Sequence, residues 1–441
     1  MAANKHNRII AIVCFVLFVL SFIAFNPGFL TPDGLDQYKQ ALSGEYTDWH
    51  PPLMAFTWRM LNHIHNGPEV MLVMQLVLLW GSVYLLATAV KSRLWYVFMV
   101  LFALAPFILN FAGNIFKDMQ MAFAWLMAFS LLFNRIVRHV KVSKLVAAIT
   151  LLLILYGTWI RPNALPGAAA LLLLWAWVMT AQQSRRVFII VSLLLIVFTV
   201  AGTFLFTGRI FNAKKQYAEN KIFMHDLAGI FVKTGDNVFP AMMYDKPQFD
   251  TGYIRANYLP ATFDFMWWNN DGKNVRPHQA DRASNKLKAA WKKAVLKYPT
   301  VYLSNRWDGF LYFLRIKKRT DEFGYSSPWV IQNEYGFVAK GRGFHEAVFA
   351  HVDMHKNMPY MRPWFWFFLN IILAGFIPLV KRKETRVLYT ALVLSSLVYV
   401  LPQFFIFQID TEFRYMYWNC IACTIALFIF IQSKLGKQAI L

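Results

Sequence analysis

Four carboxylates lie close together in segment 31–53, directly after the first strongly apolar stretch of the chain. They are Asp33, Asp36, Glu45 and Asp48. Carboxylates beside the end of a membrane helix are costly to keep near lipid, and such groups usually have a function. Surroundings of low polarity also raise the pKa of a carboxyl group toward the range of a general base. The segment therefore predicts a general base, with a loop of simply solvated acids as the alternative.

Further ionisable residues mark the ends of apolar stretches. They are His50, Lys117, Asp118, Arg161 and Arg414. Lys117 and Asp118 either serve a site or form an interfacial ion pair worth under ~1 kcal/mol. Arg414 either binds an anion, or extends its charge to the interface and pairs with Asp410 or Glu412. His50 either binds an anion or caps a turn.

The composition identifies the class of protein. The chain has 441 residues, of which 58% are hydrophobic and 15% charged. Because soluble domains contain about 25% charged residues, the chain is predicted to be an integral membrane protein. The three cysteines, Cys14, Cys420 and Cys423, all lie in apolar runs and predict no disulfide framework.

Apolar stretches long enough for ~30 Å of hydrocarbon recur along the chain. They cover 9–30, 69–90, 94–113, 118–134, 145–160, 164–182, 187–206, 364–380, 387–408 and 417–433. The first has no small-x-small cleavage site after it and is interpreted as an uncleaved span. We expect an all-α polytopic protein with roughly ten transmembrane helices.

Basic residues predict the orientation. Lys5 and Arg8 precede the first stretch, and every second short loop after it is basic. These loops contain Lys91 and Arg93; Arg135, Arg138, Lys141 and Lys144; Arg185 and Arg186; Lys381, Arg382, Lys383 and Arg386; and Lys434 and Lys437. The positive-inside rule therefore places both termini in the cytoplasm and the acidic loop outside. Arg161 is then a cation in a short outer loop, which favours a functional role.

Three regions follow from this pattern. Residues 1–206 form an N-terminal transmembrane module whose first outer loop, 31–68, carries the acids. Residues 207–362 have no long apolar run and predict a mainly helical extracytoplasmic domain. Residues 363–441 form the C-terminal transmembrane helices.

The outer region has a basic character. The segment Asp281–Lys297 predicts an amphipathic helix that lies either on anionic head groups or on the domain with a solvated face. The net charge of +22 favours an anionic partner, either lipid phosphate or a phosphorylated glycolipid. Nucleic acid is excluded because none reaches this face.

Two other clusters in the outer region have less specific patterns. His345, His351, Asp353 and His355 lack an HExxH motif or a cysteine partner, so a polar interfacial helix is preferred over a metal site. Trp267-Trp268 and the following Asn269–Asp271 suit stacking on a sugar, but buried aromatics or membrane anchors are preferred. No cofactor is predicted, and dependence on a divalent cation stays open.

Six short motifs occur in register along the chain. They are Asp33-Gly-Leu-Asp36-Gln37, Asp48-Trp-His-Pro-Pro-Leu53, Phe116-Lys-Asp118, Trp159-Ile-Arg-Pro-Asn163, His225-Asp-Leu-Ala-Gly-Ile230 and Glu412-Phe-Arg-Tyr415. Together they resemble the GT-C class of integral-membrane glycosyltransferases, and most closely the serotype-converting O-antigen glucosyltransferases. The wider class has an Asp-Glu pair where this chain has Asp33-Gly34. The base therefore stays open between Asp33, which is preferred, and Asp36.

The resemblance implies an inverting transferase in the bacterial inner membrane with a periplasmic site. A sugar, glucose by expectation, would move from undecaprenyl phosphate to O-antigen or lipopolysaccharide. A carboxylate would take the proton of the acceptor hydroxyl, and cations would stabilise the leaving lipid phosphate. Lys117, Arg161 and Arg414 are the candidates for that phosphate clamp, with Asp118, Asp48 and His50 beside them. A donor synthase and a flippase would be further partners.

Two other functions remain open. An O-antigen polymerase or ligase also has many spans and a large outer loop, but it would use diphosphate-linked donors and depend on outer-loop arginines. A transporter or flippase should show broken helices or charges at the membrane midplane, whereas the charges here stay at the ends of the apolar stretches.

Overall fold

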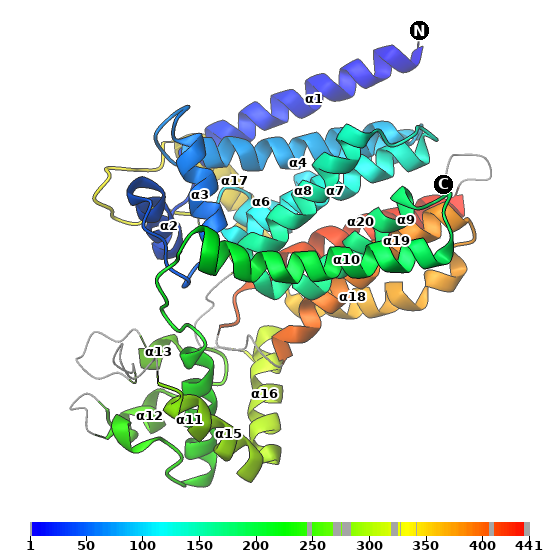
Figure 1. Cartoon of the computed structure of the whole chain (residues 1–441). Coiled ribbons are helices and arrows are strands. Elements are labelled where there is room, and N and C mark those ends of the chain that lie inside the picture. Colours follow the sequence, from blue (N-terminus) through cyan, green and yellow to red (C-terminus); the bar gives the residue numbers. More distant parts are fainter. Residues whose placement is uncertain are drawn as a thin grey trace.

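The chain is almost entirely helical. The computed structural model describes residues 2–244, 249–267, 275, 284–318, 325–326, 328–340, 342–404 and 410–435. Within these ranges there are helices and no strand, which confirms the predicted all-α class. The helices form a bundle of long apolar helices and a smaller domain at one end of it (Figure 1). We call that end of the bundle the domain end.

Seven helices in the described ranges are long and apolar enough to cross a membrane. They are α1 (Ala2–Phe25), α4 (Glu69–Ala89), α7 (Lys117–Val137), α9 (Leu165–Met179) taken with the short helix η1 (Pro162–Ala164) that runs into it, α10 (Arg185–Phe204), α19 (Lys383–Val400) and α20 (Tyr417–Leu435). α5 (Arg93–Ala103) and α6 (Pro106–Ala112), bent by 43°, make an eighth if they form one span. α8 (Lys144–Ile160) and α18 (Pro363–Gly375) are apolar but shorter. All ten predicted stretches thus contain helices, but the count of roughly ten spans is not confirmed.

Helix α7 lies at the centre of the bundle. It contacts α4, α8 and α20, and side chains on all of its faces are buried, including Trp125. α10 differs from α7 in burial, because many of its apolar side chains are exposed, including Leu193, Leu194 and Val197. A helix that is apolar all round and buried all round belongs to a core, whereas exposed apolar rows suit contact with lipid. The residues at the start of α7 are therefore held on the most constrained helix.

The acidic loop folds into two short helices at the domain end, α2 (Pro32–Ser43) and α3 (Pro52–Leu61). Each begins with proline at its first position, where the missing N–H costs nothing. Arg59 of α3 donates to the carbonyls of Ala41 and Leu42, which end α2. Gly34 lies next to the chain that enters α7, since a Cβ there would be 3.4 Å from the Ile115 carbonyl oxygen, an ordinary contact distance. The first turn of α2 therefore lies against the chain that enters α7.

The smaller domain has a core of its own. It contains α11 (Asn220–Thr234), α12 (Thr251–Asn257), α13 (Asp264–Trp267), α15 (Lys286–Lys297) and the start of α16 (Pro299–Phe313). The amphipathic helix predicted over 281–297 is present as α15; residues 281–283 lie outside the described ranges. α15 packs on α11 through Leu287 and Ala294 with its lysines outward. It lies in the half of the domain away from the bundle, so the solvated-face alternative fits better than the membrane-surface one (Figure 1).

The rest of region 207–362 packs against the bundle instead. α17 (Arg342–Met354) contacts α1 and α6. The short helix η4 (Pro359–Met361) then leads into α18. The chain from α17 onward therefore forms part of the wall of the bundle at the domain end.

Candidate active site

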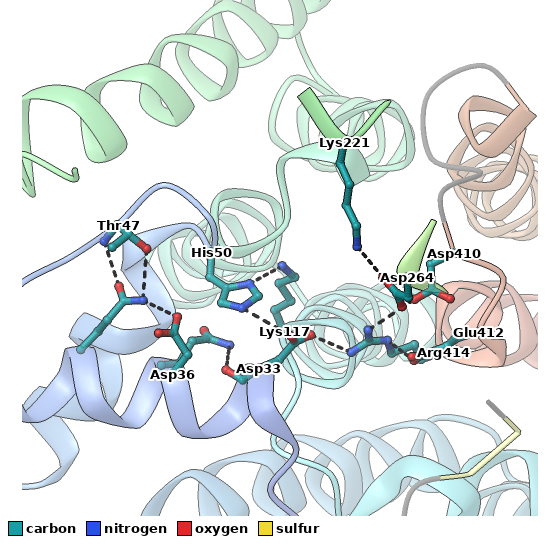
Figure 2. Close-up of polar contacts among 12 residues, drawn as sticks. Asp33, Asp36, Thr47, His50, Lys117, Lys221, Asp264, Asp410, Glu412 and Arg414 are labelled. Atoms are coloured by element: carbon teal, nitrogen blue, oxygen red, sulfur yellow. Dashed lines mark hydrogen bonds and ion pairs between the residues drawn. The ribbon is translucent and has the colours of Figure 1, made fainter. Parts of the chain in front are cut away.

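Asp33 lies in a cluster of charged and polar side chains at the domain end (Figure 2), which we call the Asp33 cluster. It stands in the first turn of α2, where its Oδ2 accepts a hydrogen bond from Arg414 Nη1 at 3.1 Å. Its Oδ1 is 3.6 Å from His50 Nε2. The side chain of Asp33 keeps a third of its surface exposed, whereas His50 and Arg414 are buried. Asp33 is thus fixed by its neighbours and still open on one side.

His50 connects Asp33 to Lys117. The Nζ of Lys117 lies 2.9 Å from His50 Nδ1. Because an ammonium group only donates, Nδ1 is the acceptor, and the ring proton is on Nε2, facing Asp33. Burial, reinforced by the charge of Lys117, lowers the pKa of His50 to about 3, so the ring is neutral at pH 7. His50 therefore accepts from the cation Lys117 at one ring nitrogen and turns its N–H toward the carboxylate of Asp33, while the ring itself is neutral at pH 7.

The charge state of Asp33 follows from competing effects. Burial alone would raise its pKa. In the acid range where Asp33 titrates, His50 is protonated, and its charge, followed by those of Arg414 and Lys117, outweighs burial and holds the pKa of Asp33 well below its usual range. Asp33 is consequently ionised at neutral pH, as a general base must be before reaction.

A second ion pair lies beside the Asp33 cluster. Arg161 Nε is 2.7 Å from Asp118 Oδ1, and Asp118 is fully buried. The guanidinium carbons of Arg161 and Arg414 lie 4.9 and 5.2 Å from the centre of the Tyr415 ring. Asp118 thus pairs with Arg161 across helices, whereas Lys117 turns to His50. Tyr415 holds the two arginines near one another.

Arg414 is shared among several carboxylates. Its Nε contacts Glu412, and Asp410 Oδ2 is 4.0 Å from its Nη2. Burial raises the pKa of Glu412 to about 8, although Arg414 opposes this effect. Burial and the charge of Asp264 also raise the pKa of Asp410. The alternative given for Arg414, pairing with Asp410 or Glu412, is present, in addition to its bond with Asp33.

Asp36 and Asp48 lie apart from the Asp33 cluster. Asp36, one turn further along α2, is exposed and accepts a hydrogen bond from Gln40 at 2.7 Å. Asp48 accepts from the backbone N–H of Gln216, in the chain that enters the smaller domain. The structure therefore brings together Asp33, His50, Lys117, Asp118, Arg161 and Arg414. It leaves Asp36 at the edge and gives Asp48 a structural contact.

The smaller domain adds two residues that sequence reasoning missed. Lys221, in the first turn of α11, lies 2.7 Å from Asp264 of α13, and Figure 2 shows this pair beside Asp410 and Arg414. Nothing in the local pattern distinguishes this lysine from others in the outer region. Tyr415 and Phe116 were also missed as positioning residues; the ring of Phe116 lies 4.3 Å from the Arg414 guanidinium. Both stand next to charged candidates, which is the signal that was available.

The other sequence candidates lie elsewhere. Trp267 is buried in the domain core, and Trp268 to Asp271 lie outside the described residues. Among the described side chains there is no group of three or more histidine, cysteine or acidic residues arranged to hold a metal ion. His345 packs on Phe29, and His355 bonds the carbonyl of His351.

No protein-family model, curated protein or solved structure matches the chain.

Proposed function

We propose that this chain is an inverting glycosyltransferase that moves a sugar, with glucose expected, from undecaprenyl phosphate to O-antigen or lipopolysaccharide. The site would face the periplasm from the bacterial inner membrane. The observation that carries the proposal is the contact of an ionised, partly open carboxylate, Asp33, with the buried cation Arg414 and, through His50, with Lys117. Acceptor activation and stabilisation of a leaving phosphate need these two kinds of group side by side.

The proposed reaction uses Asp33 as general base. Asp33 takes the proton of the acceptor hydroxyl while the hydroxyl oxygen attacks the anomeric carbon of the donor. The bond between that carbon and the phosphate oxygen breaks, and lipid phosphate leaves with the electron pair. Attack from the face opposite the phosphate inverts the anomeric configuration.

The cations would act on the phosphate. Lys117 supplies a point charge, and Arg414 supplies a planar fork that matches phosphate oxygens. A bound phosphate would also neutralise part of the charge that lowers the pKa of Asp33. The pKa of Asp33 would then rise, so donor binding would turn a weak base into a better one.

The direct test is transfer by the purified full-length protein. The protein is incubated in detergent with a radiolabelled polyprenyl-phosphate sugar and a lipopolysaccharide acceptor. We expect labelled acceptor with the wild type and none with Asp33→Asn. Full transfer by a folded Asp33→Asn protein would refute the assigned base.

The second candidate function is that of a polymerase or ligase, which would use a diphosphate-linked donor. Two outer arginines, Arg161 and Arg414, flank Tyr415, and arginine-centred sites are what that alternative requires. The same assay with a polyprenyl-diphosphate oligosaccharide separates the two. Transfer from this donor only would replace the monophosphate proposal.

The proposed orientation can be tested by labelling. All three native cysteines are buried, so an introduced exposed cysteine dominates labelling in intact cells. Lys293→Cys on α15 should react with an impermeant maleimide once the outer membrane is opened. Lys91→Cys, exposed at the opposite end of the bundle, should react only after the inner membrane is lysed. The reverse pattern would contradict a periplasmic site.

A further inference from the structure

Helix α16 of the smaller domain leaves a row of apolar side chains uncovered. Leu303 is 47% exposed and Trp307 is 54% exposed, and Leu311, one turn further on, is partly exposed. Because residues four apart lie on one face of a helix, the three form a single row, which we call the α16 row. Single exposed apolar side chains are common, whereas neighbouring ones mark an interaction surface.

The rest of α16 already has partners in the smaller domain. Polar side chains border the row on one side, where Lys233 of α11 donates to Ser304 and to Asp308, each at 3.0 Å. On the opposite face of the helix, Arg306 is buried. The α16 row is therefore left over from the packing of the domain itself.

The row lies at the end of a membrane-spanning helix. The span that contains α19 runs from Lys383 to Phe404. The ring centre of Trp307 lies 6.3 Å from that of Phe404. Phe310, beside the row, packs on the same ring and on Phe367 of α18, with ring centres 5.6 Å apart in both contacts. Trp307 is thus placed at the level where α19 leaves the apolar bundle.

The row also continues an apolar surface of the bundle. Leu401, near the end of the same span, is exposed, and so are Phe368, Ile371 and Ile372 on α18. Exposed apolar side chains on the outside of such a bundle suit contact with lipid. Figure 1 shows α16 at the domain end, crossing the direction of α10 and α18 rather than following it. α16 is therefore placed to lie along the surface of a bilayer that surrounds the bundle.

We propose that the α16 row rests in the head-group region of the bilayer and attaches the smaller domain to the membrane. Tryptophan favours this level, because its ring is largely apolar while its N–H can bond water or head groups. Leu303 and Leu311 place apolar surface against the upper parts of the acyl chains. The partner is thus a lipid surface, and the inference does not depend on glycosyl transfer.

The lipid contact fixes the position of α11 as well. α16 packs on α11. The first turn of α11 carries Lys221, which pairs with Asp264 beside Arg414 (Figure 2). A smaller domain attached through α16 therefore keeps this pair beside the Asp33 cluster.

Fluorescence quenching in vesicles tests the contact. All three native cysteines are buried, so Leu303→Cys can be labelled with an environment-sensitive fluorophore. The full-length protein is reconstituted into vesicles of phosphatidylglycerol and phosphatidylethanolamine. A doxyl quencher is carried on lipid either near the head group or at the chain end. We expect the head-group quencher to lower emission at least about twofold and to act more strongly than the chain-end quencher, because an interfacial helix enters only ~5–10 Å of the bilayer.

Two exposed positions are the matched controls. The label on Leu193→Cys, in the middle of α10, should be quenched most by the chain-end lipid. The label on Lys293→Cys, on α15, should be quenched by neither lipid. Melting temperatures are measured in parallel, and Trp307→Cys replaces Leu303→Cys if that variant does not fold.

Two outcomes would overturn the proposal. Equally weak quenching at Leu303→Cys and Lys293→Cys would show that the α16 row faces water. A label on Leu303→Cys that is shielded from water but not quenched by lipid, together with a disulfide-linked dimer of the unlabelled variant, would assign the row to a second copy of this chain.

Discussion

Two arginine–aspartate pairs in this protein are built in different ways. In the smaller domain, Arg306 Nη2 lies 2.5 Å from Asp226 Oδ2, and each side chain keeps only 2% of its surface exposed. Asp226 also accepts the indole N–H of Trp291 at 2.8 Å. This pair is closed, because domain side chains surround both partners.

The pair of Arg414 and Asp33 is open. Asp33 is one-third exposed. Its Oδ1 lies near His50, which in turn contacts Lys117. Arg414 is shared with carboxylates of its own segment. A closed pair holds a fold in one arrangement, whereas an open pair leaves a charged oxygen within reach of another molecule. Exposure of the carboxylate therefore distinguishes these two pairs, whereas the buried pair of Arg161 and Asp118 lies inside the candidate site.

The largest expected difference between the pairs is in transfer activity. Asp33→Asn removes the proposed base but keeps the side-chain shape. We expect transfer to fall about 10²–10⁴-fold, the usual contribution of general-base catalysis. The initial rate with a radiolabelled polyprenyl-phosphate sugar measures this loss, and the melting temperature should change little.

The matched control is Asp36→Asn on the same helix. Asp36 is exposed and bonded to Gln40, so we expect its variant to retain most activity. Loss of transfer in Asp36→Asn with retention in Asp33→Asn would move the base one turn along α2.

The closed pair should instead affect stability. Asp226→Asn leaves the Arg306 charge buried without its carboxylate, which costs about 3–5 kcal/mol. Limited proteolysis of the smaller domain with increasing urea measures the cost. The double variant Asp226→Leu, Arg306→Met should recover much of the stability, since apolar replacement of both charges removes the desolvation penalty. Unchanged proteolysis combined with lost transfer in Asp226→Asn would assign this pair to the reaction instead.

The closed region should also respond to acid. Burial lowers the pKa of His225 to about 4 from the ordinary value of 6.5. Between these pH values the unfolded chain binds more protons than the folded one, so stability falls as pH drops through this window and is retained above it. The full effect is roughly 3 kcal/mol at 1.36 kcal/mol per pKa unit.

His225→Gln should flatten this pH dependence, because glutamine does not titrate in this range. Its amide can still donate to the Leu259 carbonyl that His225 bonds. His63→Gln, at an exposed position, is the control and should leave the slope unchanged. Melting curves of the full-length protein from pH 4 to 7 measure both. An unchanged slope in His225→Gln would show that other groups cause the acid sensitivity.

The sequence predicted the helices and the charged positions but not the pairing. Long apolar stretches predict helices directly, because a membrane allows few other backbone arrangements. Their number is harder to predict: α8 and α18 have 17 and 13 residues, so their apolar composition alone does not make them spans. The same composition fits a crossing helix and a shorter buried one.

The partners of the charged residues come from distant parts of the chain. Arg414 and Asp33 are 381 residues apart, and Lys117 and His50 are 67 apart. Sequence order therefore suggested a pair between the neighbours Lys117 and Asp118, although these two side chains turn to different partners. Lys221 of the smaller domain could not be identified, since no local pattern shows that α11 begins beside the candidate site.

Lys221 offers the smallest test of the comparison, because it connects the two regions. Its ion pair with Asp264 lies beside Asp410, and its charge lowers the pKa that burial raises in Asp410. Lys221→Gln removes one cation at the edge of the open cluster, where a single pair is worth about 0.2–1 kcal/mol. We therefore expect a two- to fivefold rise in the apparent KM for the anionic donor, with little change in kcat. Lys233→Gln, which removes a lysine from the other end of α11 and breaks its pair with Asp308, is the matched control. A fall in kcat as large as that of Asp33→Asn would mean that the smaller domain supplies a group to the reaction itself. The division between a closed structural region and an open reactive one would then be wrong.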